Sequence, residues 1–508
     1  DAIQHRDGSA ARMCGIWAIF GAKDGVNLKC IKCFAAITHR GPDAWRLEQD
    51  AREPGALLGF SRIAIVDGLH GMQPMKLHRY PRTTLICNGE IFNCTLLQKE
   101  HNFPYETNCD VEAIIHAYHN FGIAEAVRML DAEFVFCLVD GEQRKIYLAR
   151  DPYGVRPLFR LHDPEAGTLG ICSEAKGLVG LKQSASETAT LEPFPPGYFQ
   201  VWSMLDDGTV KLDHTEQFFK PGMALSYKPY VPESDLEKMN VYEKTAHLLE
   251  AACRKRLMSD RRIGCFLSGG LDSSLVTALV VKLAKEHKLP YKIQTFAIGM
   301  GDSPDLAAAR IVADHLGTDH HEVKFDENDV REALDNVIYH LETFDITTIR
   351  ASIPMYLLSK YIKEKTDTTV VFSGEGADEV AQGYIYFRDA PSPEAGHEES
   401  LRLLSDIYLY DGLRADRTTS AFNAKLRQPQ DGVEKHLLRS SLVKSDLLPD
   451  SILWRHKEAF SDGVASVKKS LFTTIAEIIA DRYKDEPTQY KGVQPTTTEA
   501  KYYLSTHK

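Results

Sequence analysis

The sequence predicts an α/β protein with two differently built domains, and three observations support this prediction. Residues 13–203, the front domain, hold many short strand-like runs separated by turns, which is typical of layered antiparallel sheets. Residues 235–508, the rear domain, alternate helix-like and strand-like segments, which is typical of a doubly wound parallel sheet. A polar, proline-bearing linker at 204–234 separates them, and 508 residues leave room for both cores.

The front domain follows a short extension at residues 1–12. Its apolar runs are bounded by turn residues, so we expect strands at 15–20, 56–67, 83–87, 134–139, 145–149 and 198–202. Helical spacing of apolar residues predicts two helices, at 30–39 and 110–118. This mixture indicates a layered α/β domain whose sheets are largely antiparallel.

In the rear domain the order of the segments is the main signal. We expect helices at 235–258, 275–287, 305–316, 330–340 and 354–363, and strands at 263–267, 294–298 and 369–372. Parallel sheets of this kind bind ligands at the carboxyl ends of their strands. The polar loops 268–274, 299–305 and 373–379 each follow such an end, so we expect them to meet in one crevice.

The loop after the first rear strand, 266–274, has the character of a pyrophosphate cradle. Its glycines let the backbone approach an anion, and the amides at the start of the next helix point toward it. Asp272 would be repelled by phosphates unless a divalent cation lay between them, which indicates Mg²⁺. The loop lacks the Gly-Lys-Ser/Thr ending of a Walker A motif. The alternative is a tight turn that caps a helix with serine.

Composition and charge exclude some classes of protein. A net charge of −11 gives no general attraction to nucleic acid or acidic membranes, and the basic clusters are short. No apolar run approaches the ~20 residues needed to cross a bilayer, and residues 1–12 lack the apolar core of a signal peptide. We therefore expect a soluble, intracellular protein.

The ten cysteines are scattered without the spacing of a disulfide framework, so we expect reduced thiols. Cys30 and Cys33 form a Cys-x-x-Cys pair that lacks the further ligands of a zinc site. Its alternatives are a metal or redox role and two thiols on one face of a helix, and the second is favoured.

Cys14 begins the first front strand and is a candidate nucleophile. If it were the first residue of the mature chain, its own α-amine, with a pKa of about 7.7 to 8.0, could act as the base for its thiol. Asn88 and Gly89 follow a strand and offer a side-chain amide and a backbone amide as an oxyanion hole. Arg62 could bind a carboxylate and Asp110 an ammonium group. Taken alone, Cys14 is better explained as a packed thiol.

Taken together, these residues lie in motifs that occur in a known order. The front domain contains Met-Cys-Gly-Ile at 13–16, His-Arg-Gly-Pro-Asp at 39–43, Ser-Arg-Ile-Ala-Ile-Val-Asp at 61–67 and Asn-Gly-Glu-Ile-Phe-Asn at 88–93. In this order they resemble class II glutamine amidotransferases. The rear motifs at 268–274, 303–305, 342–352, 373–379 and 454–463 extend the likeness. From Met13 to His507 the chain resembles the glutamine-hydrolysing asparagine synthetases of the animal type.

The resemblance implies a front domain of the Ntn type, with αββα layers, that hydrolyses glutamine. Cys14 would attack the glutamine carboxamide and form a thioester, while Asn88 and Gly89 hold the oxyanion. The implied glutamine-binding residues are Arg62, Ile63, Ala64, Ile65, Val66, Asn88, Gly89, Glu90 and Asp110. The ammonia released would travel inside the protein.

The resemblance also implies an ATP-pyrophosphatase-like rear domain that joins ATP and aspartate into β-aspartyl-AMP and pyrophosphate. The implied ATP-binding residues are Leu267, Ser268, Gly269, Gly270, Asp272, Ser273, Ile298, Ser373 and Gly374. Asp272 and Asp378 would hold Mg²⁺. Glu375 matches a residue tied to formation and use of the adenylate, and Lys457 matches a cation that neutralises charge on the phosphates. A cytosolic homodimer, with no nucleic-acid or membrane partner, is the implied form.

Three departures from the family pattern bear on activity. While residues 1–12 precede Met13, Cys14 has no free amine, so we expect glutaminase activity only from a chain that starts at Met13 or loses this leader. At 425–431 the family carries Glu-x-Arg-Val-Pro-Phe-Leu-Asp and further helix, and this chain reads Lys-Leu-Arg-Gln-Pro-Gln-Asp. The family also continues further after Tyr502 and Tyr503.

Two alternatives stay open beside a working asparagine synthetase. One is another adenylating enzyme of the group, such as a β-lactam synthetase, although these typically lack the cysteine, and the run at 345–352 resembles the asparagine enzymes. The other is a non-catalytic relative kept for binding or regulation, which the altered segment at 425–431 keeps open.

Overall fold

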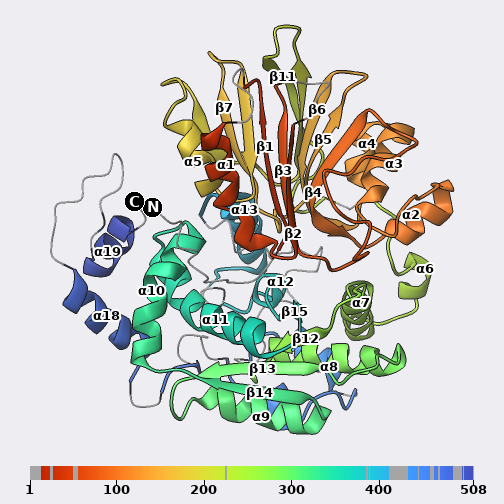
Figure 1. Cartoon of the computed structure of the whole chain (residues 1–508). Coiled ribbons are helices and arrows are strands. Elements are labelled where there is room, and N and C mark those ends of the chain that lie inside the picture. The colour runs from red at the N-terminus through yellow and green to blue at the C-terminus, as the bar shows by residue number, and fades with distance from the viewer. Residues whose placement is uncertain are drawn as a thin grey trace. The chain divides into compact units, whose positions relative to one another are not determined.

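The computed structural model describes residues 13–22, 27–49, 55–223, 226–384, 387, 390–410, 433–443, 445–457, 463–466, 469–483, 495 and 497–506. Contacts divide these residues into two compact units (Figure 1). The front unit comprises the described residues of 13–233 and 390–410. The rear unit comprises those of 234–387 and 433–506. The predicted leader at 1–12 and the altered segment at 425–431 lie outside the described residues.

Two antiparallel sheets form the centre of the front unit (Figure 1). The first has the strand order β2 (Ala44–Gln49), β3 (Leu57–Arg62), β1 (Gly15–Phe20), β8 (Thr168–Cys172), β7 (Phe159–Asp163) and β9 (Thr190–Pro193). The second has the order β11 (Val210–Gln217), β10 (Tyr198–Met204), β6 (Lys145–Arg150), β5 (Ala132–Asp140) and β4 (Thr83–Ile91).

Alternating side chains on these strands build the layers. Ile16 and Phe20 of β1 pack into the core between the two sheets, and Trp17 of β1 packs against α1 (Leu28–Ala35) and α5 (Lys176–Lys182). On β5, Val135 faces the same inter-sheet core and Phe134 faces a core shared with α2 (Cys94–His101), α3 (Glu112–Phe121) and α4 (Ile123–Met129). Because a strand's side chains point to opposite faces in turn, the order of layers is helix, sheet, sheet, helix. This confirms the predicted αββα class.

The front unit also contains a helix from far along the chain. The structure groups α13 (Pro393–Tyr410) with the front unit, although its residues follow the rear sheet in sequence. Leu401 of this helix lies beside Gly222, 3.6 Å from where a β-carbon on that glycine would be. Contact with a distant segment is not encoded in local periodicity, so the sequence patterns gave no sign of it.

The rear unit is built on a parallel sheet with the order β14 (Asp319–Lys324), β13 (Gln294–Gly299), β12 (Ile263–Phe266) and β15 (Val370–Phe372). Ala297 of β13 packs in a core with α7 (Val241–Lys255), α8 (Leu271–Glu286), α9 (Pro304–Leu316), α15 (His436–Leu442) and α16 (Asp450–Leu453). Phe296 of β13 packs on the other face with α10 (Glu327–Leu341), α11 (Ile346–Lys365), α18 (Leu471–Arg482) and α19 (Thr498–Thr506). Helices on both faces of a parallel sheet confirm the doubly wound class.

Several predicted elements were wrong in their extent. The strand expected at 83–87 continues to Ile91, so Asn88 and Gly89 lie within it, and the helix expected at 354–363 begins at Ile346. The strand expected at 56–67 ends at Arg62, because the Arg62 guanidinium binds carbonyl groups of residues 66–68 and folds that segment into a loop. The helix expected at 235–258 is divided into α6 (Glu233–Leu236) and α7, because Asn240 caps α7 in a capping box with Glu243.

All ten cysteines are free thiols. Cys30 and Cys33 lie buried on α1 within the core beneath that helix, which agrees with the prediction of two packed thiols on one helix face.

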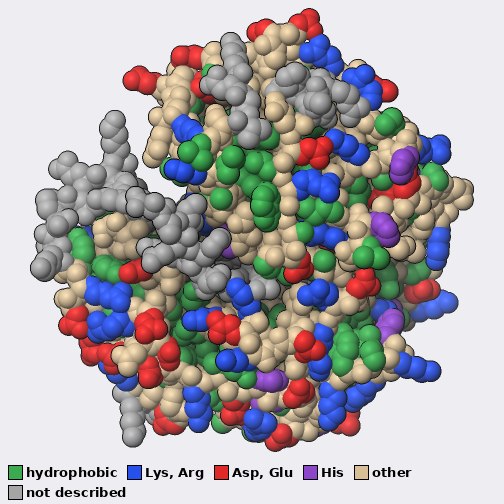
Figure 2. Space-filling model, in the orientation of Figure 1, with side chains coloured by type: hydrophobic (Ala, Val, Ile, Leu, Met, Phe, Trp, Pro, Cys, Tyr) green, Lys and Arg blue, Asp and Glu red, His purple; other side chains and the backbone are tan. Residues whose placement is uncertain are grey.

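No described helix has both the length and the apolar character needed to span a membrane. Basic and acidic side chains are interspersed over the face drawn in Figure 2.

Candidate active sites

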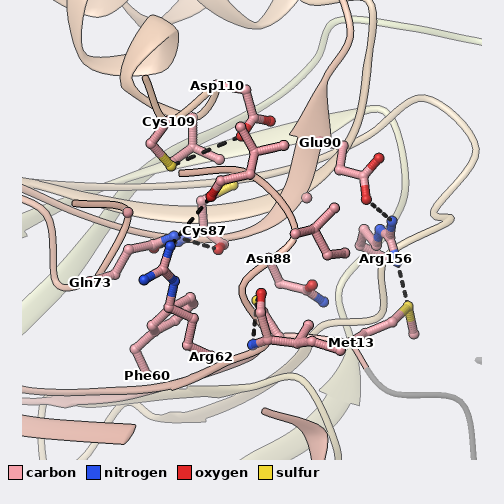
Figure 3. A pocket seen from close by; sticks show the side chains of 17 residues that line it. Met13, Phe60, Arg62, Gln73, Cys87, Asn88, Glu90, Cys109, Asp110 and Arg156 are labelled. Carbon is pink, nitrogen blue, oxygen red and sulfur yellow. Dashed lines mark hydrogen bonds and ion pairs between the residues drawn. The ribbon is translucent and has the colours of Figure 1, made fainter. Parts of the chain in front are cut away.

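A pocket in the front unit gathers the predicted glutaminase residues (Figure 3). Its walls come from the start of β1, the loop after β3, the end of β4 and the segment before α3. The predicted residues that line it are Cys14, Arg62, Ile63, Ile65, Val66, Asn88, Gly89, Glu90 and Asp110. Ala64 does not line the pocket, and its amide instead donates to Asp43 Oδ2 at 2.9 Å.

Cys14 is held at the start of β1 by backbone contacts. Its Sγ lies 3.4 Å from the Ile63 amide nitrogen, and its carbonyl accepts from Arg40 Nε at 3.0 Å. Burial raises the pKa of the Cys14 thiol, although the Ile63 backbone and the nearby Arg156 oppose the shift. The thiol is therefore protonated at neutral pH and needs a base before it can act as a nucleophile.

Asn88 has the features of an oxyanion-hole residue. Its side chain is buried in the pocket wall, and its Nδ2 has no hydrogen-bond partner among the described residues. The Gln73 side chain fixes the backbone of Cys87, the residue before Asn88. Cys87 N donates to Gln73 Oε1 at 2.5 Å, and Gln73 Nε2 donates to Cys87 O at 3.1 Å. A fixed, unpaired donor in a buried site suits a negative charge that develops only during reaction.

Arg62 and Asp110 present opposite charges to the same pocket. Arg62 donates to the carbonyls of Gly68 at 3.1 Å and Val66 at 3.3 Å, which fixes the guanidinium in the wall. Asp110 Oδ2 accepts from the Ile91 amide at 2.7 Å. Burial outweighs this hydrogen bond and raises the pKa of the Asp110 carboxyl to about 6. A carboxylate and an ammonium group of one small ligand match this pair.

The rear cradle has the backbone form that an anion site requires. Gly269 has φ +74°, and a β-carbon there would lie 2.5 Å from backbone atoms of Ala308 and Ala309 on α9, so only glycine fits. Ser268 Oγ lies 3.0 Å from Ser273 Oγ and accepts from the Gly270 amide at 3.3 Å. The cradle leads into the N-terminus of α8, a 16-residue helix.

The loop after β15 lies directly against the cradle. A β-carbon on Gly374 would lie 2.6 Å from the Asp272 carbonyl carbon and the Ser273 nitrogen. Ser373 Oγ accepts from the Glu375 amide at 3.2 Å, and the Glu375 side chain is exposed. Both loops flank the boundary between β12 and β15, where the strand order reverses, and this is where such sheets bind ligands.

Other predicted ATP residues lie along the same strand ends. Leu267 is buried and its amide donates to Phe296 O at 2.8 Å, and Ile298 is buried in β13. The third predicted loop, 299–305, contacts Gly463 and Arg455, since Ser303 Oγ donates to Gly463 O at 2.7 Å and Arg455 pairs with Asp305 at 2.9 Å.

Two lysines hold the predicted metal ligands in the substrate-free protein. Lys435 Nζ lies 2.6 Å from Asp378 Oδ1 and also pairs with Asp272, and Lys457 pairs with Asp378. Burial favours the neutral form of Asp378, but Lys435 and Lys457 outweigh it and lower the pKa of the carboxyl. Burial likewise opposes the charge on Lys435, and the two aspartates overcome it and raise the lysine pKa.

This acid pair has the chemistry of a Mg²⁺ site. Both carboxylates converge on one cationic group, and Asp272 Oδ1 is buried without a hydrogen-bond partner among the described residues. Mg²⁺ in nucleotide sites typically uses one or two carboxylates and takes its remaining ligands from phosphates and water. Among the described residues no group of three or more His, Cys, Asp or Glu side chains that could hold a metal ion occurs.

A buried ion pair positions Lys457. Arg439 NH2 donates to Glu434 Oε1 at 2.6 Å and to the Arg455 carbonyl at 3.1 Å. Glu434 Oε1 also accepts from the Lys457 amide at 3.2 Å. Glu434 and Arg439 are both buried, so α15 fixes the backbone that carries Lys457.

Comparison with known proteins identifies the family. A model of the glutamine amidotransferase domain matches residues 13–217, and a model of asparagine synthase matches 244–428 and 421–504. The chain is 48% identical to a glutamine-hydrolysing asparagine synthetase of Gallus gallus, over 97% of this chain and 92% of the relative. The relatives in Rattus norvegicus and Homo sapiens are 47% and 46% identical, with the same coverage. The chain belongs to the glutamine-hydrolysing asparagine synthetases.

Sequence reasoning missed several residues of this asparagine synthetase. In the front pocket these are Gln73 and Arg156, and in the rear site they are Glu434, Lys435 and Arg439. The run Glu434-Lys435-His436 directly follows the altered segment, so comparison of that run with the family motif was the signal that could have found Lys435. No local signal pointed to Gln73, because its role depends on contact with another segment.

Proposed function

We propose that the chain makes L-asparagine from L-aspartate and ATP, with ammonia from L-glutamine, and releases AMP, pyrophosphate and glutamate. The observation that carries this proposal is similarity to glutamine-hydrolysing asparagine synthetases over 97% of the chain. Both partial reactions therefore have counterparts in one polypeptide, one in each unit.

In the front unit, the Cys14 thiolate attacks the carboxamide carbon of glutamine. The amide nitrogen takes up a proton and leaves as ammonia, and water then hydrolyses the thioester to glutamate. Asn88 Nδ2, which has no other partner among the described residues, donates to the oxyanion together with the Gly89 amide. Arg62 binds the substrate α-carboxylate and Asp110 the α-ammonium, while residues 63–66 and Glu90 complete the wall.

The base for Cys14 is its own α-amine. Burial keeps the thiol protonated at neutral pH, so proton removal must accompany attack. An α-amine with a pKa near 8 is suited to this transfer, and an amide nitrogen is not basic. Glutaminase activity therefore belongs to a chain that begins at Cys14.

In the rear unit, an aspartate β-carboxylate oxygen attacks the α-phosphorus of ATP, and the bond to the β-phosphate breaks. The product is β-aspartyl-AMP, in which the carboxyl carbon is a good electrophile because AMP can leave from it. The cradle at 268–273 binds the pyrophosphate portion with its amides and hydroxyls, and Leu267, Ile298, Ser373 and Gly374 surround the nucleotide. Lys457 stabilises charge that develops on the phosphates.

Asp272 and Asp378 are the residues that would hold Mg²⁺, which would neutralise the phosphates when bound. Lys435 and Lys457 neutralise the same carboxylates in the substrate-free protein. Glu375, exposed in the loop beside the cradle, accepts a proton as ammonia attacks the adenylate and AMP leaves.

The test supplies ATP, Mg²⁺ and aspartate with either glutamine or ammonium, and measures asparagine and pyrophosphate. In protein that begins at residue 14, Cys14→Ala should abolish synthesis from glutamine and retain synthesis from ammonium. Asp272→Ala should abolish both. If the unaltered chain makes no asparagine from either donor, the enzymatic proposal is wrong and a non-catalytic role replaces it.

A second experiment examines the start of the chain. Protein that begins at Cys14 should hydrolyse glutamine, and protein that keeps residues 1–13 should use only ammonium, because its Cys14 nitrogen is an amide. Equal glutaminase activity in both forms would exclude the α-amine as the base. We also propose a cytosolic homodimer, to be tested by sedimentation and cell fractionation.

A further inference from the structure

A short loop carries Asp110 into the front pocket. Residues 106–110 connect a surface segment to α3, and Cys109 and Asp110 line the cavity. The position of the Asp110 carboxylate therefore depends on how this loop is held. Two buried carboxylates from outside the loop bind its backbone.

Glu112 is the first of these carboxylates. Its side chain is fully buried, and it accepts from the amides of Glu106 at 2.6 Å and Thr107 at 2.8 Å, and from Thr107 Oγ1 at 2.6 Å. Its Oε1 also lies 3.1 Å from His116 Nε2, itself fully buried one turn further along α3. Because a carboxylate only accepts, the imidazole donates to it.

Asp67 is the second carboxylate, and it belongs to the loop that follows β3. Its Oδ2 accepts from the Asn108 amide at 2.9 Å, and its Oδ1 accepts from the His70 amide at 3.0 Å. Asp67 has φ +49°, which directs its own carbonyl to the Arg62 guanidinium. One residue thus binds both the loop of Asp110 and the side chain of Arg62.

Three consecutive amides, at 106, 107 and 108, are therefore each bound by a buried carboxylate. The next amide, at Cys109, donates to Thr107 Oγ1 at 3.1 Å. The loop has no sheet or helix partners for these groups, so the two carboxylates replace secondary structure in fixing its shape.

We propose that Glu112 and Asp67 are positioning residues that set the spacing between Arg62 and Asp110, and so select an α-amino acid as the substrate of this pocket. The inference rests on the proposed function, in which Arg62 and Asp110 bind the α-carboxylate and α-ammonium of glutamine. Neither positioning residue needs to touch the substrate. Glu112 and Asp67 act by placing Arg62 and Asp110, which bind the carboxylate and ammonium groups on the α-carbon of the substrate.

Replacing either carboxylate by its amide places an NH₂ group against a backbone N–H. The loop must then shift, and the Asp110 contact with the substrate ammonium weakens. Charge-assisted hydrogen bonds of this kind correspond to about 10- to 100-fold in binding. A ligand that lacks the α-ammonium does not use this contact and should bind as before.

The experiment measures dissociation constants by calorimetry on the full chain carrying Cys14→Ala, which prevents turnover. The probes are L-glutamine and glutaramate, its analogue without the α-amino group. Glu112→Gln and Asp67→Asn should each weaken glutamine binding about 10- to 100-fold and leave glutaramate binding within about twofold. Thr107→Val replaces only the hydroxyl that Glu112 binds. It should raise the ratio of the glutamine dissociation constant to the glutaramate dissociation constant as well, but by a smaller factor.

Glu100→Gln is the matched control, because Glu100 pairs only with the exposed Lys228 in the described contacts and should leave both constants unchanged. Retained binding of glutaramate in each variant reports that its front unit is folded. The inference is overturned if the variants bind glutamine like their parent, or lose both ligands equally. If the parent itself binds no glutamine, the failure lies with the proposed function.

Discussion

At the scale of the residue, the side-chain amide of Asn88 has no hydrogen-bond partner among the described residues, and in the proposed reaction it is the feature of the front pocket that bears most directly on rate. A buried donor without a partner carries a cost in the resting protein, and an oxyanion in the transition state removes that cost. The same donor gives little to the neutral carboxamide of the bound substrate. Asn88 should therefore affect kcat more than KM.

We expect Asn88→Ala, in protein that begins at Cys14, to lower kcat for glutamine hydrolysis about 100- to 1,000-fold. KM for glutamine should change little, and synthesis from ammonium should be unaffected. Steady-state assays of glutamate release and of asparagine formation measure both effects. An unchanged kcat would assign the oxyanion to other donors.

Asp110 is the residue whose protonation matters near neutral pH. Burial raises its pKa to about 6 in the glutamine-free pocket, so the carboxyl is charged above that pH and neutral below it. Only the charged form pairs with an ammonium group. Lowering the pH therefore weakens glutamine binding.

Below pH 6 we expect the dissociation constant of glutamine to rise about tenfold for each pH unit, because each binding event must first remove one proton. Between pH 7 and 8 it should be constant. Calorimetric titrations of Cys14→Ala protein from pH 5 to 8 test this, with Asp110→Asn as the control. That variant should bind weakly, with no pH dependence from this group.

At the scale of the element, α15 connects a buried ion pair to the backbone of Lys457, a residue of the proposed ATP site. Arg439 binds Glu434, the Leu453 carbonyl and the Arg455 carbonyl, and Glu434 binds the Lys457 amide. Removing one partner of a buried pair leaves the other charge without compensation, which costs far more than an exposed pair contributes.

Arg439→Met should lower the free energy of unfolding by about 3 to 5 kcal/mol. Arg310→Met in the same unit removes an exposed pair with Glu322 and should cost less than about 1 kcal/mol. Urea denaturation followed by circular dichroism compares the two. A small effect of Arg439→Met would mean that water reaches Glu434. Pyrophosphate release should also fall in Arg439→Met, because Lys457 loses its anchored backbone.

Element boundaries show where sequence patterns stop being informative. The cradle and α8 were predictable because glycine conformation and helix starts are local properties. The end of β3 was not, since an arginine that binds carbonyls several residues later decides it. The contact of α13 with the front unit had no local signal either.

At the scale of the whole molecule, the proposed reaction couples two chemistries. Ammonia that escaped to water would become ammonium, which is not a nucleophile. A chain that carries ammonia internally should therefore favour nitrogen from glutamine over nitrogen from the medium.

Isotopic competition tests this transfer. We supply protein that begins at Cys14 with glutamine labelled by ¹⁵N at its amide and with excess unlabelled ammonium, and we expect most of the asparagine to carry ¹⁵N. Mass spectrometry of the product gives the ratio. The Cys14→Ala variant, which cannot hydrolyse glutamine, should give unlabelled asparagine. If the ¹⁵N fraction of the asparagine only equals the ¹⁵N fraction of the ammonium in the medium, internal transfer is excluded.

The sequence by itself determined the two fold classes, the cradle and most of the residues of the front pocket. These depend on strand and helix periods, glycine positions and ordered motifs, all of which are written locally. Asn88, Arg62 and Asp110 could be named in this way, since each stands in or next to a recognisable run.

Only the tertiary structure decided which distant charges meet. Lys435 contacts Asp272, 163 residues earlier, and Asp67 binds the amide of Asn108, 41 residues later. Such contacts follow from how elements pack, and a buried charge must find its partner wherever packing brings one. The lysines that neutralise the acid pair and the carboxylates that hold the Asp110 loop are therefore properties of the folded chain.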